Sequence, residues 1–547
     1  MNPRRAFSLF LKPSLALAGA CLRLMSRLLI PSICLFLSVS LGVAELPPRT
    51  NTPVGTNTWT AWRGDGTGVS PEKNLPLTWS ATEHVRWSAK VPGYGWSSPV
   101  VAAGRIFVTT AICDQQTAPA PRGPGGGEPA PDVVFRWEVH CFDAATGHPL
   151  WKQLAAEHKP TTGTHISNTY ASETPVTDGE RVYAYFGMVG VYCYDINGKL
   201  LWTRDLGAFK TFANWGSSSS PAFDGERLFI LCDNEEKSFL VALDKKTGKD
   251  VWRIARPERS TWSTPILWHN SQRTELVCMG SDYIRAYDPA TGREIWRLAS
   301  EKHLAPAAGA SDGAAGNSAG PPGPPPSRGP STGGTAGPPS RPGGGGPGGS
   351  GGGGKAASGG CKASPVAGGD LLYVGMSSKS HGTELGPMWA VKAGANGDIS
   401  LYNGETSNAG VAWFRDDAGP HFTSALVQDG RLYVFPPHDR GVLSCFDAKT
   451  GQTIYAEPLQ GAAGFKSSPC FADGKIYCTD ERGTTFVIES GPKFKVLAKN
   501  AVNEMSWASS AIASGAIFVR TTEHLLCIGG ASPAMSTVST PNRQTTK

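Results

Sequence analysis

The sequence lacks the short motifs that identify several large classes of enzyme and redox protein. Its 547 residues contain no Cys-x-x-Cys motif, which argues against a redox-active dithiol and against a covalently attached c-type haem. Neither a P-loop nor a His-Glu-x-x-His motif is present, and no His, Cys and Asp residues are spaced as zinc ligands. These absences argue against P-loop nucleotide chemistry and against zinc catalysis.

An excess of charge of one sign is also missing from most of the chain. The net charge is +6, but the first 44 residues contribute five basic residues and no acidic one. The remainder has 46 Lys and Arg against 45 Asp and Glu, and its basic residues form no continuous stripe. Nucleic acid is therefore not an expected partner.

Only one long uncharged apolar run occurs, and it follows a basic start. Residues 28–44 hold 17 uncharged residues and end in Gly42-Val43-Ala44, with small residues where a signal peptidase cuts. We expect residues 1–44 to be a signal peptide, and the protein to be exported to the periplasm or outside the cell. Two alternatives stay open: an uncleaved membrane anchor, and a lipobox-like site ending at Cys21. Contact with a membrane is expected only through a retained leader.

Glycine and proline are abundant, which argues against a mainly helical protein. The chain has 67 Gly and 43 Pro, about one residue in five. Many lie in two inserts, residues 114–132 and 301–360, the second with 21 Gly and 11 Pro among 60 residues. Such tracts cannot bury a core, so we expect disordered surface loops there and a disordered tail over 531–547.

The strongest signal is an internal repeat. A small polar pair, often Ser-Pro or Thr-Pro, precedes a glycine turn and an apolar strand. We count eight such repeats, which begin at Ser98, Thr174, Ser220, Thr264, Ser364, Ser424, Ser468 and Ser510. With the inserts removed, the spacing is about 40–60 residues, the size of a four-stranded propeller blade.

A second pattern recurs inside the repeats. It reads Ala or Cys, any residue, Asp, then Thr-Gly and a Trp eight positions after the Asp, as in residues 242–252. The Asp carboxylate suits a tight turn, Gly supplies a positive φ, and Trp can cover the edge of a neighbouring sheet. Cys141, Cys193, Cys445 and Cys527 fall in the slot that is Ala elsewhere, so we interpret them as buried thiols rather than disulfides.

These repeats predict an all-β fold: an eight-bladed β-propeller with four-stranded blades over residues 85–530, preceded by an extension over 45–84. The last repeat has no Trp strand of its own, whereas a spare strand, residues 85–91, precedes the first repeat. We therefore expect this N-terminal strand to complete the final blade and close the ring, which removes two open sheet edges.

The Ala/Cys-x-Asp-x-x-Thr-Gly-x-x-x-Trp pattern resembles the tryptophan-docking repeat of the PQQ-like (pyrroloquinoline quinone) β-propeller family, over roughly residues 59–530. That family includes quinoprotein alcohol dehydrogenases, which bind PQQ and Ca²⁺, and non-catalytic exported propellers such as the outer-membrane assembly lipoprotein. Residues 59–64, 75–79 and 95–99 look most like exported bacterial PQQ-like repeat proteins. The chain has no Cys-Cys dipeptide, a feature common in the dehydrogenases.

The family's binding funnel is lined just before each innermost strand. The resemblance therefore implies candidate cofactor- or ligand-binding residues at these positions: Trp96, Asn168, Tyr170, Glu173, Trp215, Trp262, Lys362, His421, Lys466 and Trp507. Each has a structural alternative: the tryptophans as core residues, the lysines as solvent-facing groups, His421 as a turn residue, and Glu173 as an acceptor of local hydrogen bonds. We assign no catalytic or metal-binding residue.

Two functions follow as hypotheses. The first is a non-catalytic exported propeller, expected as a monomer, that binds a protein or a small molecule at one face. The second is a PQQ- and Ca²⁺-dependent dehydrogenase acting on an alcohol or sugar. Fold alone does not decide between them.

Overall fold

The computed structural model describes residues 57–115, 119, 126–300, 361–380, 383–437 and 441–530. The expected signal peptide, the insert 301–360 and the tail 531–547 lie outside these residues, as do residues 116–118 and 120–125 of the shorter insert. The described residues form one compact unit.

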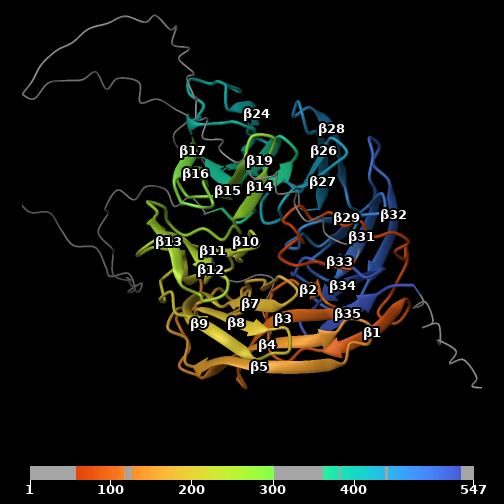
Figure 1. Ribbon diagram of the computed structural model, residues 1–547. Coiled ribbons are helices and arrows are strands. Elements are labelled where there is room, and N and C mark those ends of the chain that lie inside the picture. Colours follow the sequence, from red (N-terminus) through yellow and green to blue (C-terminus); the bar gives the residue numbers. More distant parts are fainter. Residues whose placement is uncertain are drawn as a thin grey trace, which may run out of the picture. The chain divides into compact units, whose positions relative to one another are not determined.

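Eight antiparallel sheets of four consecutive or nearly consecutive strands make up this unit, and each sheet is one blade (Figure 1). Blades 1–4 contain β2 (Val100–Ala102), β3 (Arg105–Ile112), β4 (Phe135–Asp143) and β5 (Pro149–His158); β6 (Val176–Thr177), β7 (Arg181–Tyr185), β8 (Val191–Asp195) and β9 (Leu200–Arg204); β10 (Ala222–Phe223), β11 (Arg227–Cys232), β12 (Phe239–Asp244) and β13 (Asp250–Ala255); and β14 (Ile266–His269), β15 (Thr274–Cys278), β16 (Tyr283–Tyr287) and β17 (Glu294–Ala299).

Blades 5–8 follow the same plan. They contain β18 (Val366–Gly368), β19 (Leu371–Gly375), β22 (Met388–Lys392) and β24 (Val411–Arg415); β25 (Leu426–Gln428), β26 (Arg431–Val434), β27 (Val442–Asp447) and β28 (Thr453–Pro458); β29 (Cys470–Ala472), β30 (Lys475–Thr479), β31 (Thr484–Glu489) and β32 (Val496–Ala501); and β33 (Ala511–Ala513), β34 (Ala516–Arg520), β35 (His524–Ile528) and β1 (Val85–Lys90). Outside this plan are the hairpin β20 (Ser378–Ser380)–β21 (Thr383–Leu385), β23 (Gly397–Asp398), and the 3₁₀ turns η1 (Gly187–Val189) and η2 (Phe212–Asn214).

Blade 8 is built from both ends of the propeller, as the sequence predicts. Strand β1 pairs antiparallel with β35, from Val85 opposite Ile528 to Lys90 opposite His524. In Figure 1 the orange arrow of β1 lies beside the blue arrow of β35. The eight-bladed ring is therefore closed by hydrogen bonds between the first and last strands.

The repeated Trp docks onto the repeated turn of the next blade. At the junction of blades 2 and 3, Trp202 Nε1 donates to the carbonyl of Lys245 at 3.0 Å. A Cβ on Gly248 would lie 2.5 Å from the Trp202 ring, and Gly248 has a φ of +68°. Glycine is thus required both by the backbone and by the indole above it. The same arrangement joins five junctions, through the pairs Trp87–Gly147, Trp151–Gly198, Trp202–Gly248, Trp252–Gly292 and Trp413–Gly451.

The Asp of the repeat holds this turn together. Oδ1 of Asp244 accepts hydrogen bonds from Thr247 N at 2.9 Å and from the Thr247 hydroxyl at 2.7 Å. The Thr247 hydroxyl, followed by the backbone N–H groups, lowers the pKa of Asp244 below its usual value. The recurring aspartates are therefore turn residues, as the sequence indicates.

The junction between blades 4 and 5 is built differently. Blade 5 has no Asp–Thr–Gly turn, and Trp296 is fully buried with its Nε1 donating to Glu275 Oε2 at 2.6 Å. Strand β23 adds to the edge of blade 4 in parallel, with Gly397 opposite Trp296. A different indole crosses to blade 5: Trp268 Nε1 donates to Gly369 O at 2.9 Å.

The small polar residue that begins each repeat has a role that the sequence did not reveal. Its backbone N–H donates to the side-chain hydroxyl of the corresponding residue in the next blade, as Thr174 N does to Ser220 Oγ at 2.9 Å. Seven such hydrogen bonds of 2.8–3.1 Å run in one direction around the centre of the ring, through Ser98, Thr174, Ser220, Thr264, Ser364, Ser424, Ser468 and Ser509. The eighth repeat therefore begins at Ser509, not at Ser510 as predicted, because Ser509 supplies the accepting hydroxyl.

The N-terminal extension covers the blades on either side of the closure. Trp59 is fully buried and exchanges backbone hydrogen bonds with Val101 of blade 1. Trp79 is also buried, and its backbone N–H donates a hydrogen bond to Asn500 Oδ1 of blade 7 at 3.1 Å. This extension supplies aromatic side chains where blade 7 has no docking Trp.

The cysteines behave as small apolar residues. All ten cysteines after the leader are free thiols, and eight of them are buried. Cys141, Cys193, Cys445 and Cys527 lie opposite the aromatic residue of the neighbouring strand, in the slot that the sequence predicts. Burial raises the pKa of the Cys527 thiol to about 12.

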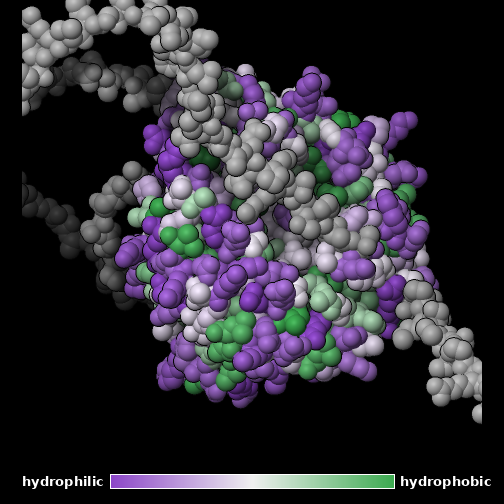
Figure 2. Space-filling model, in the orientation of Figure 1, coloured by the Kyte–Doolittle hydropathy of each residue, from purple (hydrophilic) through white to green (hydrophobic). Residues whose placement is uncertain are grey.

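The visible surface is mostly polar. Figure 2 shows hydrophilic side chains over most of the face, with hydrophobic ones in separate small groups. Within the described residues, no helix is long and apolar enough to cross a membrane.

Candidate functional site

Residues just before the innermost strands form a closed series of contacts at one end of the propeller centre. We call this set the belt; it consists of Trp96, Asn168, Trp215, Trp262, Lys362, Phe422, Lys466 and Trp507. Seven of these eight residues are among the candidates drawn from the sequence, and one comes from each blade.

Aromatic stacking closes the belt between blades 8 and 1. The rings of Trp96 and Trp507 stack with centroids 5.2 Å apart and an interplanar angle of 21°. Trp96 Nε1 donates to the carbonyl of Ser167 at 3.0 Å, which ties this pair to the segment that carries Asn168. Trp96 is thus held from both sides.

Two lysines lie over aromatic faces on the opposite side of the belt. Lys466 Nζ lies 3.0 Å from the ring centroid of Phe422 and 5.4 Å from that of Trp507. Lys362 Nζ lies 4.9 Å from the Phe422 centroid and 5.4 Å from the Trp215 centroid. Cation–π contacts of this kind fix the positions of ammonium groups at a partly buried surface.

Hydrogen bonds complete the belt in blades 2 to 4. Asn168 Nδ2 donates to the carbonyl oxygens of Trp215 at 2.8 Å and Ser217 at 3.2 Å. The Trp215 and Trp262 rings lie 5.1 Å apart, and Trp262 Nε1 donates to Gly216 O at 2.7 Å. Asn168 therefore positions the aromatic pair.

A buried arginine adds positive charge beside the Trp96–Trp507 pair. Arg520 is 1% exposed, and its Nη1 donates to the carbonyls of Ser97 at 3.3 Å and Thr109 at 2.6 Å. No carboxylate among the described residues lies within ion-pair distance of it, and burial lowers its pKa to about 9. Arg520 still carries a proton at neutral pH, so it strengthens the positive potential at this end.

Glu173 lies near the belt but is directed toward blade 3. It is 2% exposed, and its Oε1 accepts a hydrogen bond from the Ser217 hydroxyl at 2.5 Å. Burial raises the pKa of Glu173 to about 7, against the opposing effect of the Ser217 hydrogen bond. Glu173 is thus close to half protonated at neutral pH.

The residues do not assemble an evident calcium site. Asn168 Oδ1 accepts from Thr169 N at 2.8 Å and from Ser172 Oγ at 2.6 Å, so its oxygen is already used. Asn168 and Glu173 are joined through Ser217 rather than through a shared open position. Among the residues that the structure describes, no three His, Cys, Asp or Glu side chains are grouped to hold a metal ion.

Two other candidates have different surroundings. Tyr170 packs in the core of blades 1 and 2, edge-on to Phe135 at 5.0 Å, and its hydroxyl donates to Thr162 O at 3.0 Å. The His421 ring lies 4.0 Å from the Phe422 ring, tilted by 36°, and Phe422 is the residue that both lysines contact.

Phe422 and Arg520 were not found from the sequence. Phe422 was detectable, because it stands two residues before Ser424, the same offset that separates Lys362 from Ser364 and Lys466 from Ser468. Arg520 gave no such signal, because it ends a strand outside the repeated segment that precedes each innermost strand.

Comparison with known proteins agrees with this architecture. Residues 136–276 match a PQQ-type family model described as outer membrane protein assembly factor BamB. The matched segment carries the PQQ-like repeat and runs from β4 of blade 1 to β15 of blade 4. No curated protein matches the chain.

Several solved structures are similar to this chain. BamB from Moraxella catarrhalis is 10% identical, with 78% of this chain and 99% of that chain covered and a TM-score of 0.43. Quinohemoprotein alcohol dehydrogenase from Comamonas testosteroni is 11% identical, with 87% and 81% covered and a TM-score of 0.44. A europium-containing methanol dehydrogenase is 11% identical, with 86% and 90% covered and a TM-score of 0.39. Likenesses at this level carry no argument about function.

Proposed function

We propose that this PQQ-like propeller is an exported, non-catalytic binding protein whose belt takes a flat, anionic small molecule. The observation that carries the proposal is the pair of ammonium groups, Lys362 and Lys466, held over aromatic rings at the end of the propeller centre. Export is inferred from the apolar run and small-residue cleavage pattern of residues 1–44.

The charge and shape of the belt favour such a ligand over a neutral one. Lys362, Lys466 and Arg520 contribute three positive groups beside one carboxylate, Glu481, which forms an ion pair with Lys466 at 3.8 Å. Three belt rings are partly exposed and offer a planar molecule an aromatic surface to pack against: Trp215, Phe422 and Trp507. An anionic aromatic molecule would satisfy both features.

Quenching of intrinsic tryptophan fluorescence tests this proposal. We expect naphthalene-2,6-dicarboxylate to bind at least tenfold more tightly than the neutral naphthalene-2,6-dimethanol, and Lys362→Ala or Lys466→Ala to weaken it about tenfold. Lys159→Ala is the matched control, because Lys159 pairs with Asp132 in an exposed ion pair on blade 1. Equal affinity for the two probes would overturn the proposal.

The second candidate is a PQQ-dependent dehydrogenase, and the same lysines and tryptophans favour it, since PQQ is a flat tricarboxylate. These residues could hold its carboxylates and its ring system; the bound quinone would supply the redox chemistry. The oxygen ligands for Ca²⁺ fit less well, because Asn168 Oδ1 is already hydrogen-bonded twice.

Adding PQQ, Ca²⁺, an alcohol panel and a redox dye separates the two functions. We expect no dye reduction and no Ca²⁺-dependent rise in Tm. Dye reduction, or a Ca²⁺-dependent rise in Tm that Glu173→Gln abolishes, would favour the dehydrogenase instead.

A further inference from the structure

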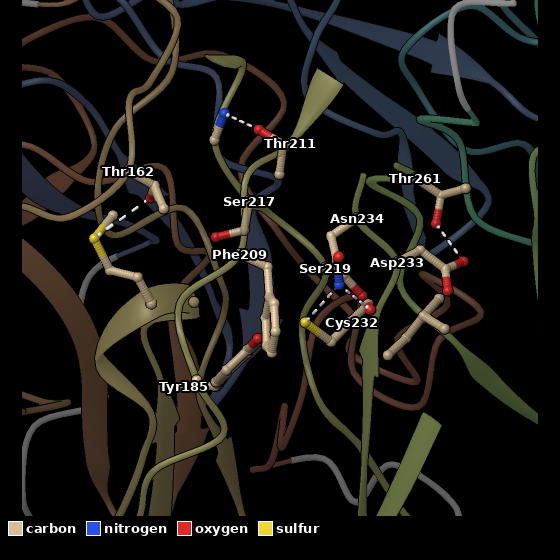
Figure 3. Close-up of a pocket in the computed structure, with 15 residues that line it drawn as sticks. Thr162, Tyr185, Phe209, Thr211, Ser217, Ser219, Cys232, Asp233, Asn234 and Thr261 are labelled. Carbon is tan, nitrogen blue, oxygen red and sulfur yellow. Dashed lines mark hydrogen bonds between the residues drawn. The ribbon is translucent and has the colours of Figure 1, made fainter. Parts of the chain in front are cut away.

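A second site lies between blades 2 and 3 and adjoins the belt, since Gly216 and Ser217 line it and accept hydrogen bonds from Trp262 and Asn168. Figure 3 shows a cavity bounded by η1 of blade 2, by the segment between β9 and β10, and by the end of β11. Ser217, Ser219, Thr211 and Thr261 contribute hydroxyl groups to its wall. The cavity is therefore rich in groups that can both donate and accept hydrogen bonds.

The cavity offers no uncompensated charge. Its carboxylate, Asp233, is fully buried and forms a two-point ion pair with Arg256, at 2.8 Å from Nε and 3.0 Å from Nη2. Thr261 Oγ1 also donates to Asp233 Oδ2 at 3.0 Å. A charged ligand would lose its hydration without gaining an opposite charge, so a neutral ligand is favoured.

One wall hydroxyl lacks a protein partner. Ser219 is 6% exposed, and its Oγ makes no hydrogen bond to the described residues. An unsatisfied buried hydroxyl costs about 1–3 kcal/mol unless a water or ligand meets it. Ser217 is different: its hydroxyl donates a hydrogen bond to Glu173, so toward the cavity it can act only as an acceptor.

An aromatic surface forms the opposite side of the cavity. Phe209 lies over Gly207, where a Cβ would come within 2.8 Å of its ring, and Tyr185 stands beside it in Figure 3. The space open to the centre of a water molecule is about 40 Å³. At roughly 10–15 Å³ for each water, this admits two or three hydroxyl-sized groups.

We propose that this cavity binds one edge of a neutral polyol or sugar ring without chemical change. Adjacent hydroxyls of the ligand would meet Ser219 and Thr261, and its C–H face would lie on Phe209. This ligand differs from the flat anion that we propose for the belt.

Saturation-transfer-difference NMR on the full chain after leader removal tests the proposal. With glucose as the probe, we expect transfer to ring protons in the wild type, a tenfold weaker affinity in Ser219→Ala, and loss of transfer in Phe209→Ala. Gluconate, the anionic counterpart, is expected to bind at least tenfold more weakly than glucose.

Ser263→Ala provides the matched control. Ser263 holds the same repeat position in blade 4, is fully buried, and does not line the cavity. Blade 5 has Ala363 at this position, so the fold accepts alanine there. Absence of transfer from glucose, equal effects of Ser219→Ala and Ser263→Ala, or tighter binding of gluconate would each overturn the proposal.

Belt variants keep the two sites distinguishable. Lys362→Ala is expected to leave glucose binding unchanged, whereas Ser219→Ala should leave binding of naphthalene-2,6-dicarboxylate unchanged. Parallel loss of both ligands in either variant would show that the cavity is part of the belt and would contradict an independent sugar site.

Discussion

Blades 2 and 3 are joined by an indole resting on a glycine turn, whereas blades 4 and 5 are joined without that turn. At the first junction, Trp202 is half-buried and contacts the next blade at Gly248 and Lys245. At the second, Trp296 is fully buried within its own sheet under β23, and Trp268 makes the crossing. The docking motif is thus one of two ways in which neighbouring sheets are joined in this ring.

The difference also shows what the repeat is for. The turn presents a carbonyl and a bare Cα to the incoming ring at five junctions; four of these turns read Asp-x-x-Thr-Gly, and the fifth, residues 195–198, is one residue shorter and has no Thr. Blade 5 lacks this sequence, and the chain between β22 and β24 instead folds back over blade 4, where Ile399 N donates to Arg297 O at 2.9 Å.

The largest expected effect concerns the receiving glycine. Gly248→Ala should lower the free energy of unfolding by about 3 kcal/mol. The new Cβ would clash with the Trp202 ring, and alanine is strained at the positive φ of this residue. Gly430→Ala is the control: its φ is +70°, but nothing lies within 4 Å of the added Cβ. In urea unfolding, Gly430→Ala should lower the free energy of unfolding by about 1 kcal/mol. Equal losses in the two variants would show that contact with the Trp202 ring does not contribute.

Each junction has a buried carboxylate, and the two differ in whether a positive charge lies beside them. Glu275 pairs with Arg273 at 2.9 Å, whereas Glu173 has a hydroxyl, Ser217, as its hydrogen-bond partner. Since burial raises the pKa of Glu173 to about 7, the native state binds an extra proton above the ordinary pKa of 4.5. Stability should therefore fall as pH rises from about 4.5 to 7, by on the order of 2–3 kcal/mol, and stay lower above that.

Glu173→Gln should remove this loss. Thermal unfolding at pH 4.5 and pH 8 is the measurement: the variant should equal the wild type at the lower pH and exceed it at the higher. An identical pH dependence in both proteins would show that Glu173 is not the titrating group.

The hydrogen bonds of the two indoles should also differ in strength. Trp296→Phe removes the donor to the buried Glu275 carboxylate and should cost about 2 kcal/mol, since the bond is charge-assisted. Trp202→Phe removes a donor to a backbone carbonyl and should cost about 1 kcal/mol. Reversal of this order in urea unfolding would mean that β23, rather than Glu275, holds Trp296.

The smallest effect is expected for the Ser and Thr hydroxyls at the centre of the ring, which form the same hydrogen bond at both junctions. Ser364→Ala and Ser220→Ala each remove one accepting hydroxyl, which meets Thr264 N and Thr174 N respectively, and should each cost about 1 kcal/mol. A markedly larger loss for Ser364, at the junction without a docking Trp, would show that the central ring compensates there for the missing motif.

Much of this architecture follows from the sequence because it repeats. The Asp–Thr–Gly–Trp pattern predicts the docking contact, and the unpaired strand before the first repeat predicts the closure by β1. Trp413 was not recognised as a docking residue, because a long connection separates it from Trp389 on the preceding strand of blade 5. The start of the eighth repeat was predicted one residue too late, at Ser510, because two adjacent serines fit the pattern. The hydrogen bond from Ser468 N identifies Ser509 as the equivalent residue.

The candidate site was predictable only in outline. An offset from the repeated serines locates Lys362 and Lys466, but it does not say that both ammonium groups meet one ring, that of Phe422. Arg520 and Ser219 are defined by what surrounds them in three dimensions. A single sequence does not show that a polar side chain is buried without a hydrogen-bond or ion-pair partner.

The pairing of β1 with β35 has a mechanical consequence. Val85 lies opposite Ile528, so the two chain ends leave blade 8 from the same corner, and Gly529 N still donates to His84 O at 3.0 Å. A force that pulls Val85 and Ile528 apart would break the hydrogen bonds between β1 and β35 one after another from this end, rather than all at once. A pull on the N-terminus would first have to release Trp59 and Trp79 of the extension from blades 1 and 7. Peeling β1 away would then lift Trp87 from Gly147 and expose the side of blade 1.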